Sequence, residues 1–242
     1  MKAMLSTVPG DPESLKWTEL PDPVPKQGEV RIAVKAAGVN FPDTLIIKDL
    51  YQIKPTRPFA PGGEVAGVID AVGESVEDWA VGDRVMALCG FGGFVTKICV
   101  STNVCSKIPD KMPFDQAACF VFTYGTSYHA LVQRASLKAG ESLLIIGAAG
   151  GTGTACIQLA LAAGATPIAV VGGEEKVALV RSLGVEHVVD HRETPEWVDA
   201  VHAMSGGGVD ICFDAVGGDA YQKARRCMAW DGRLLIIGFV GG

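Results

Sequence analysis

Polar and apolar residues alternate over short runs in the first part of the chain, about residues 1–108. In EVRIAVKAAG, Val30, Ile32 and Val34 fall on one face, which is typical of a strand with one side buried. Comparable short runs between turn residues are EVAGVIDAVG, GDRVMALCG, GFVTKICV and VCSKIP. This part of the chain is therefore predicted to form a β-barrel or a folded sheet.

From about Glu141 the strand-like runs become apolar on both faces and alternate with helical stretches. The apolar runs are SLLIIG, TPIAVV, EHVVD, VDICFD and RLLIIG. Strands of this kind belong to a parallel sheet that helices cover on both sides. In EEKVALVRSLG, Val177, Val180 and Leu183 form one stripe that ends at Gly184, which suits a helix C-terminus. The βαβαβ order predicts a doubly wound α/β sheet with right-handed crossovers.

The pattern changes near residue 125, so we expect two domains, 1–124 and 125–242. A chain of 242 residues, 48% of them hydrophobic, is long enough to bury two modest cores. Its net charge of -6, with interspersed acids and bases, argues against nucleic acid as a partner. The start, MKAMLSTVPGDP, lacks the apolar core of a signal peptide, and no segment has the length of a membrane span. We therefore expect a cytoplasmic protein with no membrane partner.

The cysteines and histidines are dispersed along the chain. No C-x-x-C pair occurs, and no histidines stand at zinc-binding spacing from a cysteine. This pattern predicts reduced thiols in packed positions and no metal site. The seven cysteines stand at positions 89, 99, 105, 119, 156, 212 and 227.

An apolar run breaks into glycines and resumes as a helix of small residues in LLIIGAAGGTGTACIQLALAAGA, from Leu143 to Ala165. Glycines between a strand and a helix let the chain turn tightly and let backbone N–H groups approach a pyrophosphate. The predicted cofactor-binding residues of this turn are Gly147, Ala149, Gly150, Gly151, Thr152 and Gly153. The last of these is also expected to let the helix pack close to the sheet. The alternative is a packing turn that holds no ligand.

The end of the next strand, TPIAVV, indicates which dinucleotide binds. Sites specific for NAD place an acidic residue there to accept a hydrogen bond from the ribose 2′-hydroxyl. Here the strand runs into Gly172 and Gly173, and Glu174 and Glu175 fall at the start of a helix, where acids are common. With Lys176 beside them, the pattern favours a 2′-phosphate and hence NADPH, with Gly172 and Lys176 as cofactor-binding residues. The alternative is that Lys176 is an ordinary solvated lysine.

Several segments together resemble one family. GESLLIIGAAGGTGTACIQLA resembles the signature of the quinone oxidoreductase family of the medium-chain dehydrogenase/reductase superfamily, with Gln158 present and Leu161 in place of the usual basic residue. Further similar segments are GVNFPDTLIIKDLYQ, PFAPGGEVAGVI, VGDRV, TYGTSYHAL, DAVGG and GRLLIIGF, so the resemblance extends over essentially the whole chain. The resemblance implies a GroES-like β-barrel domain for catalysis and substrate at 1–124, then a Rossmann-type doubly wound sheet at 125–242. It also implies an active site in the cleft between the two.

The resemblance also predicts that no zinc takes part. Zinc-dependent alcohol dehydrogenases of this superfamily carry a histidine in the motif that reads PGGEVAG here, where Gly63 takes its place. No cysteine near Asn40 supplies the other early ligand, and the cysteine-rich lobe for structural zinc is missing. Glu64 is then expected to be a charged structural contact at the base of the cleft.

By the same resemblance, the catalytic residues are Tyr51, Asn40 and Asp43. Tyr51 would donate its phenol hydrogen to a substrate oxygen, and Asn40 would lie beside the nicotinamide or the substrate. The alternative is structural: Tyr51 packs at the end of a loop and Asp43 caps a turn.

Four further cofactor-binding residues follow from the family pattern. Thr126 is expected near the nicotinamide ribose, while Gly238 and Phe239 end a strand that should lie over the nicotinamide. His191 stands where relatives often have a tyrosine that touches the 2′-phosphate, and it would strengthen NADPH binding if protonated. The alternative for His191 is an exposed loop histidine.

The resemblance implies an NADPH-dependent oxidoreductase that passes hydride to a quinone or an activated C=C bond without zinc. One alternative is an enoyl-thioester or 2-alkenal reductase on the same scaffold, in which Lys48, Lys54 and Arg57 receive a CoA phosphate. Alternatively, Lys48, Lys54 and Arg57 are solvated charges in loops. A further alternative is a non-catalytic NADPH-binding protein with a structural or regulatory role.

Family members continue beyond GFVGG with a last strand and helices that close the nucleotide fold. We therefore expect a sheet that lacks its C-terminal strand and helices, either because the chain is shortened or because the open edge is covered in another way. The full-length form is expected to be a homodimer.

Overall fold

The computed structural model describes residues 1–241. The chain forms two compact units, an N-terminal unit, Met1–Phe122, and a C-terminal unit, Thr123–Gly242. No helix within 1–241 is both long enough and apolar enough to cross a membrane. The functional roles assigned to residues 1–124 and 125–242 stay predictions.

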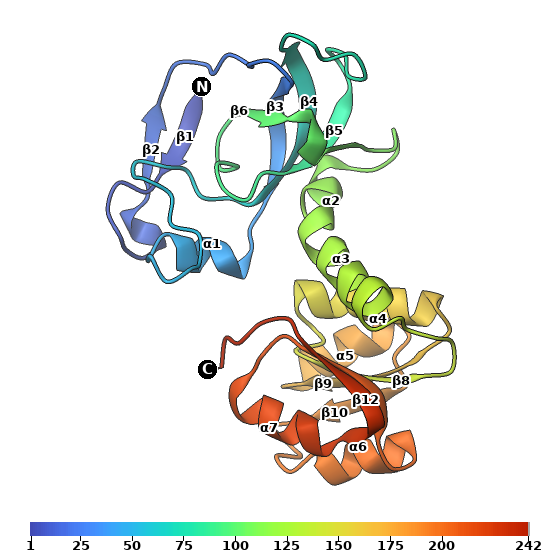
Figure 1. The fold of residues 1–242 in the computed structure, drawn as a ribbon. Helices are drawn as coiled ribbons and strands as arrows, with labels where there is room; N and C mark the ends of the chain where they lie inside the picture. The colour runs from blue at the N-terminus through green and yellow to red at the C-terminus, as the bar shows by residue number, and fades with distance from the viewer. Residues whose placement is uncertain (242) are drawn as a thin grey trace. The chain divides into compact units, whose positions relative to one another are not determined.

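The N-terminal unit contains a five-stranded antiparallel sheet in the order β6-β3-β4-β5-β7, as the alternating pattern predicted (Figure 1). Val30 and Ile32 of β3 are fully buried together with Ile69 and Val85, because alternate residues of a strand point to the same face. The strands are β3 (Glu29–Gly38), β4 (Glu64–Val72), β5 (Arg84–Leu88), β6 (Lys97–Ser101) and β7 (Cys105–Lys107). A separate two-stranded sheet pairs β1 (Lys2–Leu5) with β2 (Lys16–Glu19).

Short helices complete the N-terminal unit. The helix α1 follows β3 directly, and α2 packs on the sheet through Ala117 and Ala118, which are buried with Ala66 and Ile108. The bounds are η1 (Pro12–Ser14), α1 (Phe41–Ile46), η2 (Thr102–Val104) and α2 (Phe114–Ala118). The next helix, α3 (Phe120–Tyr128), begins in this unit and ends in the C-terminal unit, where η3 (His129–Arg134) follows it.

The C-terminal unit is a doubly wound α/β fold with a five-stranded parallel sheet in the order β10-β9-β8-β11-β12, which confirms the predicted fold class. The strands are β8 (Ser142–Ile146), β9 (Thr166–Val171), β10 (His187–Asp190), β11 (Val209–Asp214) and β12 (Met228–Ile236). Helices α4 and α5 cover one face of this sheet, and α6 and α7 cover the other (Figure 1). The helices are α4 (Gly151–Ala162), α5 (Glu174–Ser182), α6 (Val198–Ser205) and α7 (Gly218–Arg226).

Coverage on both faces explains why these strands are apolar throughout. Leu143 and Ile145 of β8 are buried against α4 and α5, while Leu144 and Ile146 are buried on the opposite face. The predicted stripe on EEKVALVRSLG is confirmed as α5, which ends at Ser182. Gly184 follows with φ +96°, a conformation that favours glycine after a helix.

Candidate functional site

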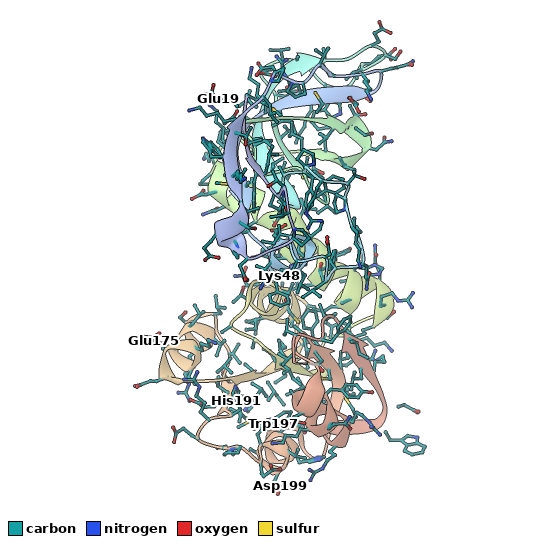
Figure 2. All side chains as sticks on the ribbon, turned by 90° about the vertical axis from the view of Figure 1, so that its left-hand side faces the viewer. Glu19, Lys48, Glu175, His191, Trp197 and Asp199 are labelled. Atoms are coloured by element: carbon teal, nitrogen blue, oxygen red, sulfur yellow. The ribbon has the colours of Figure 1, made fainter. Side chains whose placement is uncertain are left out.

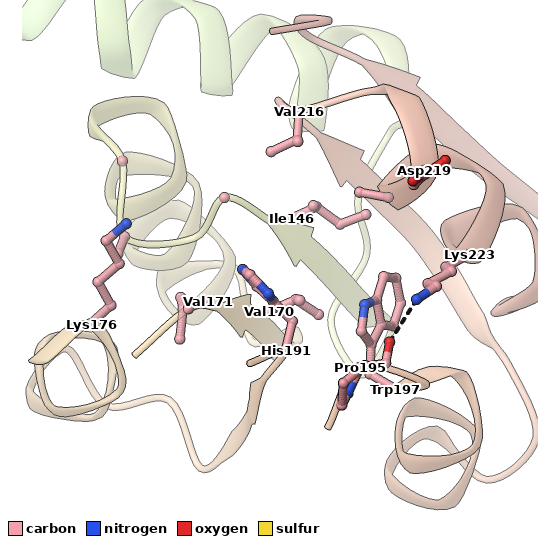
Figure 3. Close-up of a pocket in the computed structure, with 15 residues that line it drawn as sticks. Ile146, Val170, Val171, Lys176, His191, Pro195, Trp197, Val216, Asp219 and Lys223 are labelled. Atoms are coloured by element: carbon pink, nitrogen blue, oxygen red, sulfur yellow. Dashed lines mark hydrogen bonds between the residues drawn. The ribbon is translucent and has the colours of Figure 1, made fainter. Parts of the chain in front are cut away.

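A cavity of about 410 Å³ opens in the C-terminal unit near the ends of β8 and β9 (Figure 3). The strand order reverses at β8, which has β9 on one side and β11 on the other. In open parallel sheets, ligands bind at such a switch point, beyond the carboxyl ends of the strands. The lining residues are Ile146, Gly147, Ala149, Gly150, Val170, Val171, Gly172, Lys176, His191, Pro195, Trp197, Val216, Asp219, Ala220 and Lys223.

The glycine turn forms one edge of this cavity. Gly147 has φ +75°, and α4 begins at Gly151 after the extended residue Gly150. A Cβ atom at Gly153 would lie 2.5 Å from the carbonyl oxygen of Gly147, so only glycine lets the helix start this close to the strand. The N–H groups in the first turn of α4 have no acceptor within the helix and suit an anion.

The cavity brings together six of the predicted cofactor residues: Gly147, Ala149, Gly150, Gly172, Lys176 and His191. They come from the turn after β8, the segment after β9 and the segment after β10, which strand pairing places side by side. Lys176 and His191 lie on one side of the cavity, and Asp219 and Lys223 of α7 lie on the other (Figure 3).

Six other predicted cofactor residues of the C-terminal unit do not line the cavity. Three of them, Gly151, Thr152 and Gly153, form the first turn of α4. Thr126 is half-buried on α3, and the hydroxyl of its neighbour Ser127 donates a hydrogen bond to the carbonyl of Thr152 (2.9 Å). The N–H of Gly238 bonds weakly to the carbonyl of Asp214 (3.4 Å), and the next residue, Phe239, is 65% exposed.

The sequence analysis did not predict the apolar and charged residues that line the cavity on the side of α6 and α7. Trp197 is 3% exposed and lines the cavity, whereas Asp199, two residues later, points outward (Figure 2). The ammonium of Lys223 bonds to the carbonyl of Pro195 (2.6 Å) and pairs with Glu196 (3.0 Å). Among these lining residues, only Val216 lies in a segment, DAVGG, whose family resemblance could have predicted a position in the site.

Asp190, at the end of β10, is a further residue that the sequence pattern did not single out. Its carboxylate accepts hydrogen bonds from the N–H of Gly173 (3.0 Å) and of Arg192 (2.9 Å). These backbone hydrogen bonds hold the pKa of Asp190 below its ordinary value, since they stabilise the ionised form. This acid therefore ties the turn after β9 to the segment after β10.

In the N-terminal unit, Asn40, Asp43 and Glu64 form one hydrogen-bonded cluster. Asn40 precedes α1, and its side-chain nitrogen Nδ2 donates to Oε1 of Glu64 (2.9 Å). The carboxylate of Asp43 accepts from the backbone N–H of Asn40 (2.8 Å) and of Gly62 (3.1 Å). The second oxygen of Glu64 accepts from the N–H of Phe122 (2.9 Å). Asp43 therefore holds the backbone around Asn40, while Glu64 orients its side chain.

Both carboxyl groups of this cluster are buried, with Asp43 7% and Glu64 1% exposed. Burial raises the pKa of each above its ordinary value, while the hydrogen bonds from N–H donors partly offset the effect. A Cβ atom at Gly38 would lie 2.6 Å from Oε1 of Glu64 and 2.5 Å from the carbonyl of Ala118. Glycine at position 38 is therefore required to make room for the carboxylate.

Tyr51 lies in the loop after α1 and packs, half-buried, against Ile46, Ile47 and Phe59. This contact agrees with the structural alternative for its ring and leaves a role for its hydroxyl as a prediction. Arg57 anchors the same loop, since its guanidinium donates to Asp49 (2.7 Å), to the carbonyl of Ile47 (2.9 Å) and to Ser6 (3.2 Å).

The residues around Gly63 do not fit a zinc ion. A Cβ atom at Gly63 would be in ordinary contact with the carbonyl of Gly90 (3.5 Å) and the ring of Phe122 (3.6 Å), and glycine offers no ligand. The thiol of Cys89 donates to the carbonyl of Gly62 (3.4 Å), and burial raises its pKa to about 12. Across residues 1–241, no group of three or more His, Cys, Asp and Glu side chains is arranged to hold a metal ion.

Comparison with known proteins gives the family. The sequence model described as Alcohol dehydrogenase GroES-like domain matches residues 26–110, and the one described as Zinc-binding dehydrogenase matches residues 151–242. The chain is 36% identical over 235 residues to the quinone oxidoreductase of Homo sapiens, covering 96% of this chain and 71% of that protein. The chain belongs to the quinone oxidoreductase family of the medium-chain dehydrogenase/reductase superfamily.

Other members of the quinone oxidoreductase family and superfamily extend the comparison. A quinone oxidoreductase-like protein 2 homolog of Nematostella vectensis is 36% identical over 217 residues, which are 88% of this chain and 59% of that protein. The chain thus spans less than two thirds of that relative.

Two solved structures share the fold over nearly the whole chain. A mycobacterial protein, Rv1454c, complexed with NADPH, has a TM-score of 0.92 and 30% identity, covering 100% of this chain and 75% of that one. The CurK enoyl reductase has a TM-score of 0.91 and 31% identity, covering 99% of this chain and 74% of that one.

Proposed function

We propose that this protein is an NADPH-dependent oxidoreductase that transfers hydride to a quinone or an activated C=C bond without zinc. The cavity at the switch point carries the proposal, because a glycine turn, an apolar floor and the side chains of Lys176 and His191 meet there. The first turn of α4 would hold the pyrophosphate, and Lys176 and His191 would face the 2′-phosphate. Bound NADPH supplies the hydride.

For the nicotinamide end, we propose Asn40, Thr126, Gly238 and Phe239 as binding residues. The hydrogen bond from Asn40 to Glu64 supports this role for Asn40, since it fixes the side-chain amide in one orientation. Asp43 would act through Asn40 as a positioning residue, because its carboxylate is bonded to backbone N–H groups.

The acceptor chemistry follows from the residues at Gly63. Without zinc ligands there, no Lewis acid polarises a substrate carbonyl, so the acceptor must be electrophilic already or be polarised by hydrogen bonds. Quinones and enones meet this requirement. Tyr51 would donate its phenol hydrogen to the acceptor oxygen and stabilise the negative charge that develops on it.

The test is to follow oxidation of NADPH by the purified chain with a panel of acceptors, with and without EDTA. We expect 1,4-benzoquinone or an enone to accelerate oxidation and EDTA to have no effect. Absence of turnover with every acceptor would contradict the enzymatic function, and loss of activity in EDTA would contradict the zinc-free mechanism.

An enoyl-thioester or 2-alkenal reductase is the second candidate, and the similarity to the CurK enoyl reductase supports it. The predicted phosphate-binding role of the basic residues is less favoured, because Lys48 pairs with Asp11 (2.5 Å) and Arg57 pairs with Asp49 (2.7 Å). A crotonyl-CoA arm in the same panel separates this candidate from a quinone reductase. Binding of NADPH without any turnover would instead support the non-catalytic alternative.

We further propose that the protein is cytoplasmic and acts as a homodimer. Sedimentation of the purified protein tests the oligomeric state, and fractionation of the source cells tests the location.

A further inference from the structure

Two side chains from the segment after β10 occupy the space beside the Gly172–Gly173 turn. A Cβ atom at Gly172 would lie 2.6 Å from Nε2 of His191 and 3.3 Å from Nε of Arg192. A Cβ atom at Gly173 would lie 3.0 Å from Nη1 of Arg192. The guanidinium of Arg192 therefore packs on the turn where β9 ends, beside the cavity that Lys176 and His191 line.

Strand pairing and one carboxylate hold Arg192 in this place. β10 runs parallel to β9 with Asp190 opposite Val171, so the two strands end together. Asp190 then bonds to the N–H of both Gly173 and Arg192. Because the carboxylate of Asp190 is hydrogen-bonded to the backbone of both Gly173 and Arg192, it fixes the backbone of Arg192 relative to the turn.

Within residues 1–241, the guanidinium of Arg192 makes no hydrogen bond or ion pair, and the only hydrogen bond of this residue to Asp190 is from its backbone N–H. By contrast, Arg31 pairs with Asp70 (2.6 Å) and Arg57 with Asp49 (2.7 Å). The planar N–H donors of Arg192 are thus available to an anion at this turn, and a guanidinium binds phosphate oxygens in pairs.

We propose that Arg192 determines specificity for NADPH by binding the 2′-phosphate together with Lys176 and His191. The inference rests on the proposed function, since it concerns the same cofactor. A side chain at position 172 would require the ring of His191 to move, since its Cβ atom would lie 2.6 Å from Nε2 of His191.

The experiment measures binding of four ligands by calorimetry: NADPH, NADH, 2′,5′-ADP and 5′-AMP. The proteins are wild type, Arg192→Gln, Lys176→Gln, and Arg181→Gln as a matched control, since Arg181 is an exposed arginine at the other end of α5. We expect Arg192→Gln to weaken NADPH and 2′,5′-ADP about 10- to 100-fold, the usual range for a charged hydrogen bond. Binding of NADH and 5′-AMP should change less than about twofold, and the control should match wild type.

Three results would overturn the inference in distinguishable ways. If wild type prefers NADPH and Arg192→Gln keeps that preference while Lys176→Gln loses it, Arg192 is not a determinant and the proposed function stands. If Arg192→Gln weakens NADPH and NADH equally, the role of Arg192 is structural. If wild type binds NADH as tightly as NADPH, the cofactor in the proposed function is wrong and the inference falls with it. Thermal unfolding of each variant checks that it is folded.

Discussion

The side-chain nitrogen of Asn40 donates a 2.9 Å hydrogen bond to Oε1 of Glu64, a carboxyl group that is only 1% exposed. The other oxygen of Glu64 accepts from the N–H of Phe122 (2.9 Å). One buried acid therefore connects the residue before α1 with the start of α3. Because Asn40 is a proposed binding residue, Glu64 would influence the binding site by orienting the side chain of Asn40.

Replacing Glu64 by alanine should lower the free energy of unfolding by about 2 to 4 kcal/mol, because it opens a cavity and leaves two partly buried N–H groups without an acceptor. Urea unfolding measures the change. The matched control is Glu77→Ala, which removes an exposed carboxylate and should change stability by less than about 0.5 kcal/mol. Equal stability of the two variants would contradict the structural role of Glu64.

Stability should depend on pH through Glu64. Burial raises its folded pKa above the ordinary value of 4.5, so its contribution to stability is complete below pH 4.5 and is lost as the pH rises through the raised pKa. Glu64→Gln cannot ionise and lacks this loss. In urea unfolding at a series of pH values, wild type should therefore lose stability relative to Glu64→Gln as the pH increases from 4.5, and the difference should become constant above the raised pKa. An increase in the stability of wild type relative to Glu64→Gln with rising pH would contradict this prediction.

Two glycines of the turn after β8 should respond differently to alanine. At Gly153, the new Cβ would lie 2.5 Å from the oxygen of Gly147, so α4 must move, and we expect a loss of about 1 to 3 kcal/mol in stability. NADPH binding should weaken at least about tenfold, since the N–H groups of the first turn move with the helix. Gly150→Ala is the control for stability, with a closest distance of 3.3 Å to the oxygen of Gly147. Calorimetry measures NADPH binding, and thermal unfolding measures stability. Similar losses of stability in the two variants would contradict the role of close packing at Gly153.

Tyr51→Phe tests the hydroxyl apart from the packing of the ring against Ile46 and Phe59. Loss of a hydrogen bond to the developing oxyanion should lower the turnover number with quinone about 10- to 100-fold, with NADPH affinity and stability unchanged. Tyr128→Phe, which alters an exposed tyrosine on α3, is a matched control. Full activity of Tyr51→Phe would leave Tyr51 with only its packing role.

Arg57→Gln should loosen the loop that carries Tyr51. The guanidinium bonds to Asp49, Ile47 and Ser6, so its loss should cost about 1 to 3 kcal/mol in stability and lower quinone turnover. Lys54→Gln removes a charge from the same exposed loop and serves as the comparison. Hydrogen exchange of residues 47–59 measures the opening directly, and unchanged exchange rates would refute the anchoring role.

Much of the fold was predictable because its elements follow local patterns. Alternation at Val30 and Ile32 predicted β3, and the stripe through Val177 and Val180 predicted α5, both of which the structure confirms. The α/β class followed from strands that are apolar on both faces. The glycine turn was also identifiable, since Gly153 permits a close approach that no other residue allows.

The rest of the cavity wall could not be predicted in this way. Trp197 and Lys223 lie in segments with no motif, and they reach the cavity only because α6 and α7 pack on one face of the sheet. Arg192 lies in no motif that the sequence analysis identified, and its contact with the Gly172–Gly173 turn depends on the register of β10 against β9. In the same way, nothing near Glu64 in the sequence indicates that its carboxylate meets Asn40.

By itself, the sequence determined the two kinds of sheet, the glycine turn and the absence of a histidine at Gly63, because each depends on residue types at fixed spacing along the chain. Only the tertiary structure decided that Glu64 orients Asn40, that Asp190 is bonded to the backbone and that Arg192 covers the turn after β9. These relationships depend on strand register and helix packing, which bring together side chains that are distant in sequence, and a local pattern contains no information about that pairing.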